Sequence, residues 1–289
     1  MKEQTPPADS AQKTIDQEIK QSVSDSADVA KSHGEILREQ LIEGMETFDA
    51  HRRSVFISSF TAGMEIGFSY LLMGTIFSFF SNDFSNDALF KLISLAYPLG
   101  FILVVFGQSV LFTEQTSLLS LPVFNKKRSV KSLLGLWGIV IAGNLIGGYI
   151  ISLVFLWICP KLGLFEYDTV SIVANHVISF SPLVILVSAI LAGWLMGLLS
   201  WLVTSSRDTI TRFVIIFMIT ATMSFTGLHH SIIGSIEVFS GMITSADIGF
   251  VDYLTFQVLA LIGNAIGGVV FVALFKYRAF VTNVDLYSD

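Results

Sequence analysis

Long apolar stretches alternate with short polar segments along the chain from residue 54 onward. A helix that crosses the hydrocarbon core of a bilayer needs about 20 predominantly apolar residues. Stretches of that kind predict six membrane-spanning helices, over roughly residues 54–80, 92–123, 132–158, 182–204, 213–242 and 252–275.

Two of these stretches carry polar runs where the middle of the membrane would lie. The second holds "TEQT", Thr113 to Thr116, and the fifth holds "GLHHSIIGS", Gly227 to Ser235. Non-helical backbone at membrane depth is tolerated only where it is buried in protein or lines a water-filled cavity. Both spans are therefore predicted to break inside the membrane, the second span at "TEQT" and the fifth span at "GLHHSIIGS", and to border a pathway.

Short motifs recur between the two halves of the six-span region. "GNLIGG", Gly143 to Gly148, returns as "GNAIGG", Gly263 to Gly268, and "AGMEIGFSYLL" from Ala62 is echoed by "AGWLMGLLSWL" from Ala192. Because each unit has three spans, the second copy must enter the membrane from the opposite side. The predicted fold is all-α, an integral membrane bundle of six transmembrane helices in an inverted 3+3 repeat with helices 2 and 5 broken. The glycines are expected to serve close helix packing.

The regions outside the spans differ in character. Residues 1–30 are polar and poor in large apolar side chains, so we expect a disordered cytoplasmic tail. Residues 31–53 are predicted to form an amphipathic cytoplasmic helix packed on the bundle, because apolar residues recur there at helical spacing: Leu37, Leu41, Met45 and Phe48. Residues 54–278 are the six-span domain, and residues 279–289 a C-terminal cytoplasmic tail.

Composition and charge agree with a membrane protein and give it an orientation. Apolar residues make up 53% of the chain and charged residues 14%, with a mean hydropathy of +0.70, which excludes an ordinary soluble domain. Most Lys and Arg outside the tail fall on one side of the predicted membrane, whereas Lys91 and Lys161 fall on the other. By the positive-inside rule both termini are expected in the cytoplasm. No cleaved signal peptide is recognised, and the single cysteine, Cys159, is expected to be an apolar filler.

The motifs at the two breaks resemble those of a known family. "VLFTEQTSLLSLPVF", from Val110, and "GLHHSIIGSIEVFSG", from Gly227, are similar to the breaks of the formate/nitrite transporter family, in particular its YfdC-like branch. The resemblance covers roughly residues 33–278. It implies an aquaporin-like fold, a homopentamer in a bacterial inner membrane with one pore per protomer, and passage of small monovalent anions such as formate or nitrite. Protons and lipid are further expected partners. No enzymatic activity, cofactor, metal or nucleic acid is expected.

The resemblance also implies roles for residues at the breaks. Leu111 and Phe112 match the family's apolar constriction, with ordinary core packing as the alternative. Thr113, at the start of a half-helix, is expected to cap backbone amides or to hydrogen-bond the central histidine. That histidine is His230, which could lend the anion a proton because imidazole titrates near physiological pH. His229 points elsewhere and is expected to hydrogen-bond a neighbouring span.

Three carboxyl groups lie within the predicted spans, where a negative charge would repel an anion. Glu114 follows "LFT", and Glu65 and Glu237 lie in the first and fifth spans. Intramembrane carboxylates are costly and are usually paired, protonated or functional. We expect Glu114 to have a structural or gating role, for example by pairing with a basic residue of the cytoplasmic face. The half-helix starts, whose positive dipole ends point to the midplane, favour an anion.

Three other readings stay open from the sequence. An aquaporin-like channel for a neutral solute would carry Asn-Pro-Ala at both breaks, and the chain contains no Asn-Pro. An intramembrane enzyme could use His229, His230, Glu237 and Glu114 as metal ligands or acid/base groups, but no His-x-x-x-His or His-x-x-Glu spacing is present to place two ligands on one helix face. The third is a membrane scaffold that transports nothing.

Overall fold

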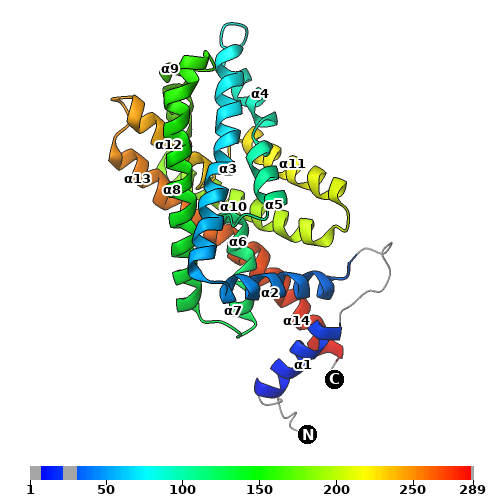
Figure 1. Ribbon diagram of the computed structural model, residues 1–289. Coiled ribbons are helices and arrows are strands. Elements are labelled where there is room, and N and C mark those ends of the chain that lie inside the picture. Colours follow the sequence, from blue (N-terminus) through cyan, green and yellow to red (C-terminus); the bar gives the residue numbers. More distant parts are fainter. Residues whose placement is uncertain (1–7, 22–30, 288–289) are drawn as a thin grey trace.

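The computed structural model describes residues 8–21 and 31–287, which contain helices joined by turns and loops. In chain order the elements are α1 (Ala8–Gln21), α2 (His33–Asp49), α3 (Arg52–Phe79), α4 (Asn86–Leu92), η1 (Ile93–Leu95), α5 (Pro98–Gly107), α6 (Phe112–Leu118), α7 (Leu121–Phe124), α8 (Val130–Leu162), α9 (Tyr167–Ile178), α10 (Pro182–Ser205), α11 (Thr209–Phe225), α12 (Ile233–Thr244), α13 (Phe250–Ile266), the π-helix η2 (Gly267–Leu274) and α14 (Phe275–Tyr287). Helix α2 lies across one end of the long helices α3 and α8, and α9 lies at the other end (Figure 1). We call these ends the α2 face and the α9 face.

Helix lengths and an apolar exterior define a multi-pass membrane protein. Within the described residues, five helical stretches are long and apolar enough to cross a membrane: Arg52–Phe79, Asn86–Gly107, Val130–Leu162, Pro182–Ser205 and Phe250–Asn283. Thr209–Phe225 and Ile233–Thr244 are shorter apolar helices. On α8 an exposed apolar stripe recurs every three or four residues, comprising Ile146, Ile150, Leu153 and Trp157. Such a stripe suits contact with lipid or with another subunit.

Glycines bring two pairs of helices into close contact, α3 with α8 and α10 with the continuous run of α13 and η2. A Cβ atom on Gly147 would collide with the carbonyl of Phe60, and a Cβ atom on Gly267 would collide with the carbonyl of Ile190. Gly147 and Gly267 hold equivalent positions in "GNLIGG" and "GNAIGG". The predicted packing role of these glycines is confirmed, and equivalent residues of the two motifs make equivalent contacts.

The N-terminal region differs from the sequence prediction. Where disorder was expected over residues 1–30, Ala8–Gln21 form the helix α1, with Ile15 and Ile19 buried, and the rest of that tail lies outside the described residues. Burial against the neighbouring helices α2 and α14 supplies the stabilisation that the tail sequence by itself does not. Helix α2 packs on the bundle, and its buried Gln40 amide donates to Ser200 Oγ at 3.1 Å.

Three further boundaries differ from the predicted ones. The second span was predicted to break at "TEQT", but Thr113 to Thr116 lie inside α6, and the non-helical residues are 108–111. The amphipathic helix α9 occupies part of the segment between the third and fourth predicted spans, where no helix was predicted. The C-terminal residues expected to be a tail continue as α14 to Tyr287.

Candidate functional site

Both helix breaks begin where a residue leaves the helical conformation with a positive φ. Gln108 follows α5 with φ 56°, and Gly227 follows α11 with φ 71°. A left-handed residue ends a helix because its next amide turns away from the helical hydrogen-bond direction. Leu111 is extended, and α6 starts directly after it.

One buried asparagine supports each break with three side-chain hydrogen bonds. Asn144 Oδ1 accepts from the amide of Phe112 at 2.8 Å, and its Nδ2 donates to the carbonyls of Ser59 and Val110 at 2.7 and 2.9 Å. These bonds join α3 and α8 to the backbone of the first break.

Asn264 repeats the arrangement at the second break. Its Oδ1 accepts from the amide of Ser231 at 2.8 Å, and its Nδ2 donates to the carbonyls of Ala189 and His229 at 2.8 and 3.1 Å. Asn144 and Asn264 are the second residues of "GNLIGG" and "GNAIGG". The predictions from these motifs concerned only the glycines, although an uncharged amide repeated at equivalent positions of two apolar spans is visible in the sequence.

The two breaks are joined by a hydrogen bond between Thr113 and His230. Thr113 Oγ1 lies 2.8 Å from His230 Nε2, and both residues are fully enclosed. His230 Nδ1 accepts a hydrogen bond from the amide of Ile232 at 3.2 Å, so Nδ1 carries no hydrogen. The hydrogen of the neutral imidazole is therefore on Nε2. His230 therefore donates from Nε2 to Thr113. The phenyl ring of Phe101 meets the imidazole edge-on, with ring centroids 5.2 Å apart.

At each half-helix start one backbone amide is bound by a side chain. Phe112 N–H is bound by Asn144, and Ile232 N–H is bound by His230. That the positive ends of these half-helices favour an anion stays a prediction. The polar hydrogens of His230 Nε2 and of the Thr113 hydroxyl lie at the contact between the two breaks.

Leu111 and Phe112 are each 1% exposed and belong to the main hydrophobic core. The ring of Phe112 meets that of Trp137 edge-on, with centroids 5.6 Å apart. Core packing, the alternative given for these two residues, is therefore present, and their role as a constriction stays a prediction.

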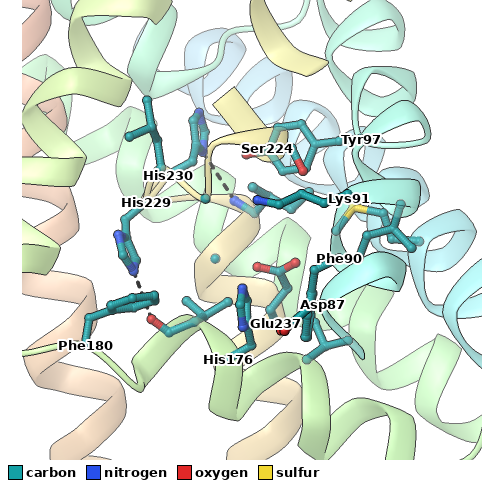
Figure 2. Close-up of a pocket in the computed structure, with 18 residues that line it drawn as sticks. Asp87, Phe90, Lys91, Tyr97, His176, Phe180, Ser224, His229, His230 and Glu237 are labelled. Atoms are coloured by element: carbon teal, nitrogen blue, oxygen red, sulfur yellow. Dashed lines mark hydrogen bonds between the residues drawn. The ribbon is translucent and has the colours of Figure 1, made fainter. Parts of the chain in front are cut away.

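A cavity of about 380 Å³ opens on the α9 face and reaches His230. It lies among α4, α9, α12 and the second break (Figure 2). Its polar and ionisable lining includes Asp87, Lys91, Tyr97, His176, His229, His230 and Glu237. The sequence analysis did not identify His176, which α9 brings to this cavity.

His229 also lines this cavity, but both of its ring nitrogens are engaged by the protein. Nδ1 lies 2.8 Å from Ser188 Oγ, and Nε2 lies 3.0 Å from the carbonyl of Val177, to which it donates. His229 thus ties the second break to α9 and α10, in agreement with the interhelical hydrogen bond predicted for it.

A second cavity, of about 590 Å³, opens on the α2 face and is rich in carboxyl groups. Glu39, Glu43, Glu46 and Glu114 line it together with Arg212. Restricted access to water, and then the charges of Glu46 and Glu39, raise the pKa of the Glu43 carboxyl in α2 above its ordinary value.

The expected partner of Glu114 is not present in the described part of the chain, where its carboxyl forms no ion pair. Arg212, in the same cavity, donates instead to the carbonyl of Ser206 at 3.1 Å. The structural or gating role of Glu114 stays a prediction.

In a helical membrane protein, a buried polar pair with a cavity on either face is typical of membrane channels and transporters. Residues 34–278 match the family model for formate/nitrite transporters. The chain therefore belongs to the formate/nitrite transporter family, whose members are transporters and channels rather than enzymes.

Two relatives and two solved structures show the extent of the similarity. The inner membrane protein YfdC of Escherichia coli (strain K12) is 27% identical over 241 residues, 81% of this chain and 74% of YfdC. The uncharacterized transporter YrhG of Bacillus subtilis (strain 168) is 28% identical over 250 residues, 85% of this chain and 92% of YrhG.

An FNT family ion channel superposes with a TM-score of 0.76 at 20% identity, covering 84% of this chain and 98% of that channel. A pentameric formate channel with formate bound gives a TM-score of 0.67 at 21% identity, covering 80% of this chain and 98% of the other. At these identities the two structures establish a shared fold.

Proposed function

We propose that this protein carries small monovalent anions of the formate and nitrite type across a membrane, along a path in each protomer that passes the Thr113–His230 pair. The supporting observation is that cavities from both faces approach the pair. His230 lines the α9-face cavity, and Glu114, the neighbour of Thr113, lines the α2-face cavity. One relative is named a transporter, and one similar structure is titled a formate channel with formate bound.

The proposed architecture has six spans in an inverted repeat. In it α11 and α12 together form the fifth span, α5 and α6 form most of the second, and the two asparagine-supported breaks are equivalent. The α2 face carries most of the Lys and Arg of the inter-span segments, so it is the cytoplasmic side and both termini lie there. One relative is named an inner membrane protein and one similar structure is titled pentameric, which supports a homopentamer in a bacterial inner membrane.

In the proposed mechanism the substrate crosses the centre as its neutral conjugate acid. A charge at the bilayer centre costs about 3 kcal/mol or more, and the apolar side chains of Leu111 and Phe112 near the break add to that barrier. His230 Nε2–H and the Thr113 hydroxyl provide the hydrogen bonds at the crossing point. For His230 to pass its Nε2 proton to the anion, Nδ1 must first take up a proton and release the amide of Ile232.

Proteoliposomes test this proposal directly. Formate and nitrite uptake should rise as the outside pH falls, beyond the leak measured with protein-free liposomes. His230→Asn should abolish the pH dependence of uptake, whereas His229→Asn should lower the thermal stability and leave the pH profile in place. Uptake equal to that of protein-free liposomes for every small anion would refute transport and favour a scaffold. Uptake of glycerol without pH dependence would favour a channel for neutral solutes.

A further inference from the structure

Glu237 has no assigned role in the path described above, yet its carboxyl group points into the α9-face cavity (Figure 2). It lies on α12, seven residues after His230, which precedes that helix. The residue is 6% exposed. Within the described part of the chain its carboxyl forms no hydrogen bond or ion pair.

The ionisable groups around Glu237 come from several elements. Helix α4 contributes Asp87 and Lys91, α9 contributes His176, and the second break contributes His229 and His230. Lys91, the cation of this set, donates to the carbonyl of Phe225 at 2.6 Å and is not within ion-pair distance of Glu237. The set therefore surrounds Glu237 without neutralising it.

Phenol groups complete the ionisable surroundings. Tyr97 lines the same cavity, and Tyr70 of α3 is buried with an unbonded hydroxyl. None of these groups carries a positive charge, so a carboxylate at this depth is unfavourable and the group is stabilised by holding a proton.

His230 offers no spare proton to the α9-face cavity in its neutral form. Its Nδ1 accepts an amide hydrogen, and its Nε2 hydrogen is shared with Thr113. Of the two carboxyl groups that line this cavity, Asp87 is exposed and Glu237 is buried, so a protonated Glu237 has an O–H free to bind an incoming anion. An acid that binds the conjugate base of another weak acid forms a strong charge-assisted hydrogen bond.

We propose that Glu237 is the proton donor of the α9-face cavity and protonates the entering substrate anion before the anion reaches His230. This inference rests on the proposed function and adds the residue that supplies the proton on this face. In the transfer, the Glu237 O–H bond breaks, the proton joins a carboxylate oxygen of the substrate, and Glu237 becomes a carboxylate. Water on the α9 face then returns a proton to Glu237. Chloride and nitrate, as conjugate bases of strong acids, cannot take this proton and are excluded.

The flux test uses Glu237→Gln, which keeps the size of the side chain but cannot transfer a proton. Formate uptake by proteoliposomes should fall at least tenfold, lose its pH dependence, and lose its preference over nitrate. Glu237→Asp should restore part of the pH dependence. Glu166→Gln, an exposed carboxyl on the same face, is the matched control and should behave as wild type. The inference would be overturned if Glu237→Gln, with the wild-type size-exclusion profile, took up formate at the wild-type rate and with the wild-type pH profile.

A binding measurement separates this inference from the proposed function. Calorimetric titration of the purified protein with formate, in buffers of different ionisation enthalpy, should show uptake of about one proton per formate bound. Glu237→Gln should lose that uptake. Proton-linked binding without flux would refute transport but retain the role of Glu237. Binding without proton uptake would refute the role of Glu237, and the absence of both binding and flux would overturn both.

Discussion

Replacing Asn144 by Leu tests whether the side-chain amides hold the breaks in place. Leu has nearly the shape of Asn, so the change removes three hydrogen bonds, to Phe112, Ser59 and Val110, without opening a large cavity. It also leaves the buried amide of Phe112 without its acceptor.

The structure allows the size of the effect to be worked out. Each intramolecular hydrogen bond contributes about 1 kcal/mol in soluble proteins, and about 0.6 kcal/mol on average within a membrane protein. Three bonds at Asn144 therefore give a destabilisation of about 2 to 3 kcal/mol. For a domain of this size 1 kcal/mol corresponds to about 2–4 °C, so the melting temperature should fall by about 4–12 °C.

Thermal unfolding in mild detergent measures this effect. Asn264→Leu should lower the melting temperature by a similar amount, because its three bonds are equivalent. Asn175→Leu is the matched control, since Asn175 is exposed and its amide donates only to Ser171 of its own helix, and it should change the melting temperature little. If both buried variants melt within about 2 °C of this control, the reasoning about the breaks is refuted.

Two further predictions concern charge. Glu114→Gln should raise formate influx severalfold in proteoliposomes, because it removes an unpaired carboxyl from the α2-face cavity; a loss of influx would show that Glu114 supports the break instead. Burial lowers the pKa of the His33 imidazole in the folded protein, although its hydrogen bond to the Lys276 carbonyl acts in the opposite direction. In the unfolded state the imidazole protonates near its ordinary pKa of 6.5, so acid favours the unfolded state. The melting temperature of wild type should therefore fall more steeply below pH 6.5 than that of His33→Gln, and equal slopes would contradict the assignment.

Local sequence signals located most of the helices and the second break. The apolar run from Arg212 ends as a helix at Phe225, and "GLHHSIIGS" begins with Gly227, whose positive φ a glycine adopts without strain. The first break was misplaced because Gln108, not a polar run, leaves the helical conformation. Glutamine gives little sequence indication of a positive φ, and "TEQT" can be helical once its polar side chains face protein partners.

What the sequence by itself determined is the membrane class, the glycine-mediated packing and the candidate histidine, because apolar length, small-residue motifs and residue type are local properties. Tertiary structure decided which groups meet. Thr113 and His230 lie 117 positions apart and are brought together at 2.8 Å, and His176 reaches the same cavity as Glu237 through a helix too short to be predicted as a span. The tertiary structure also shows that both ring nitrogens of His230 form hydrogen bonds, whereas the Glu237 carboxyl forms none within the described residues. The sequence could not show this, because a hydrogen bond depends on atomic distance and direction rather than on sequence position.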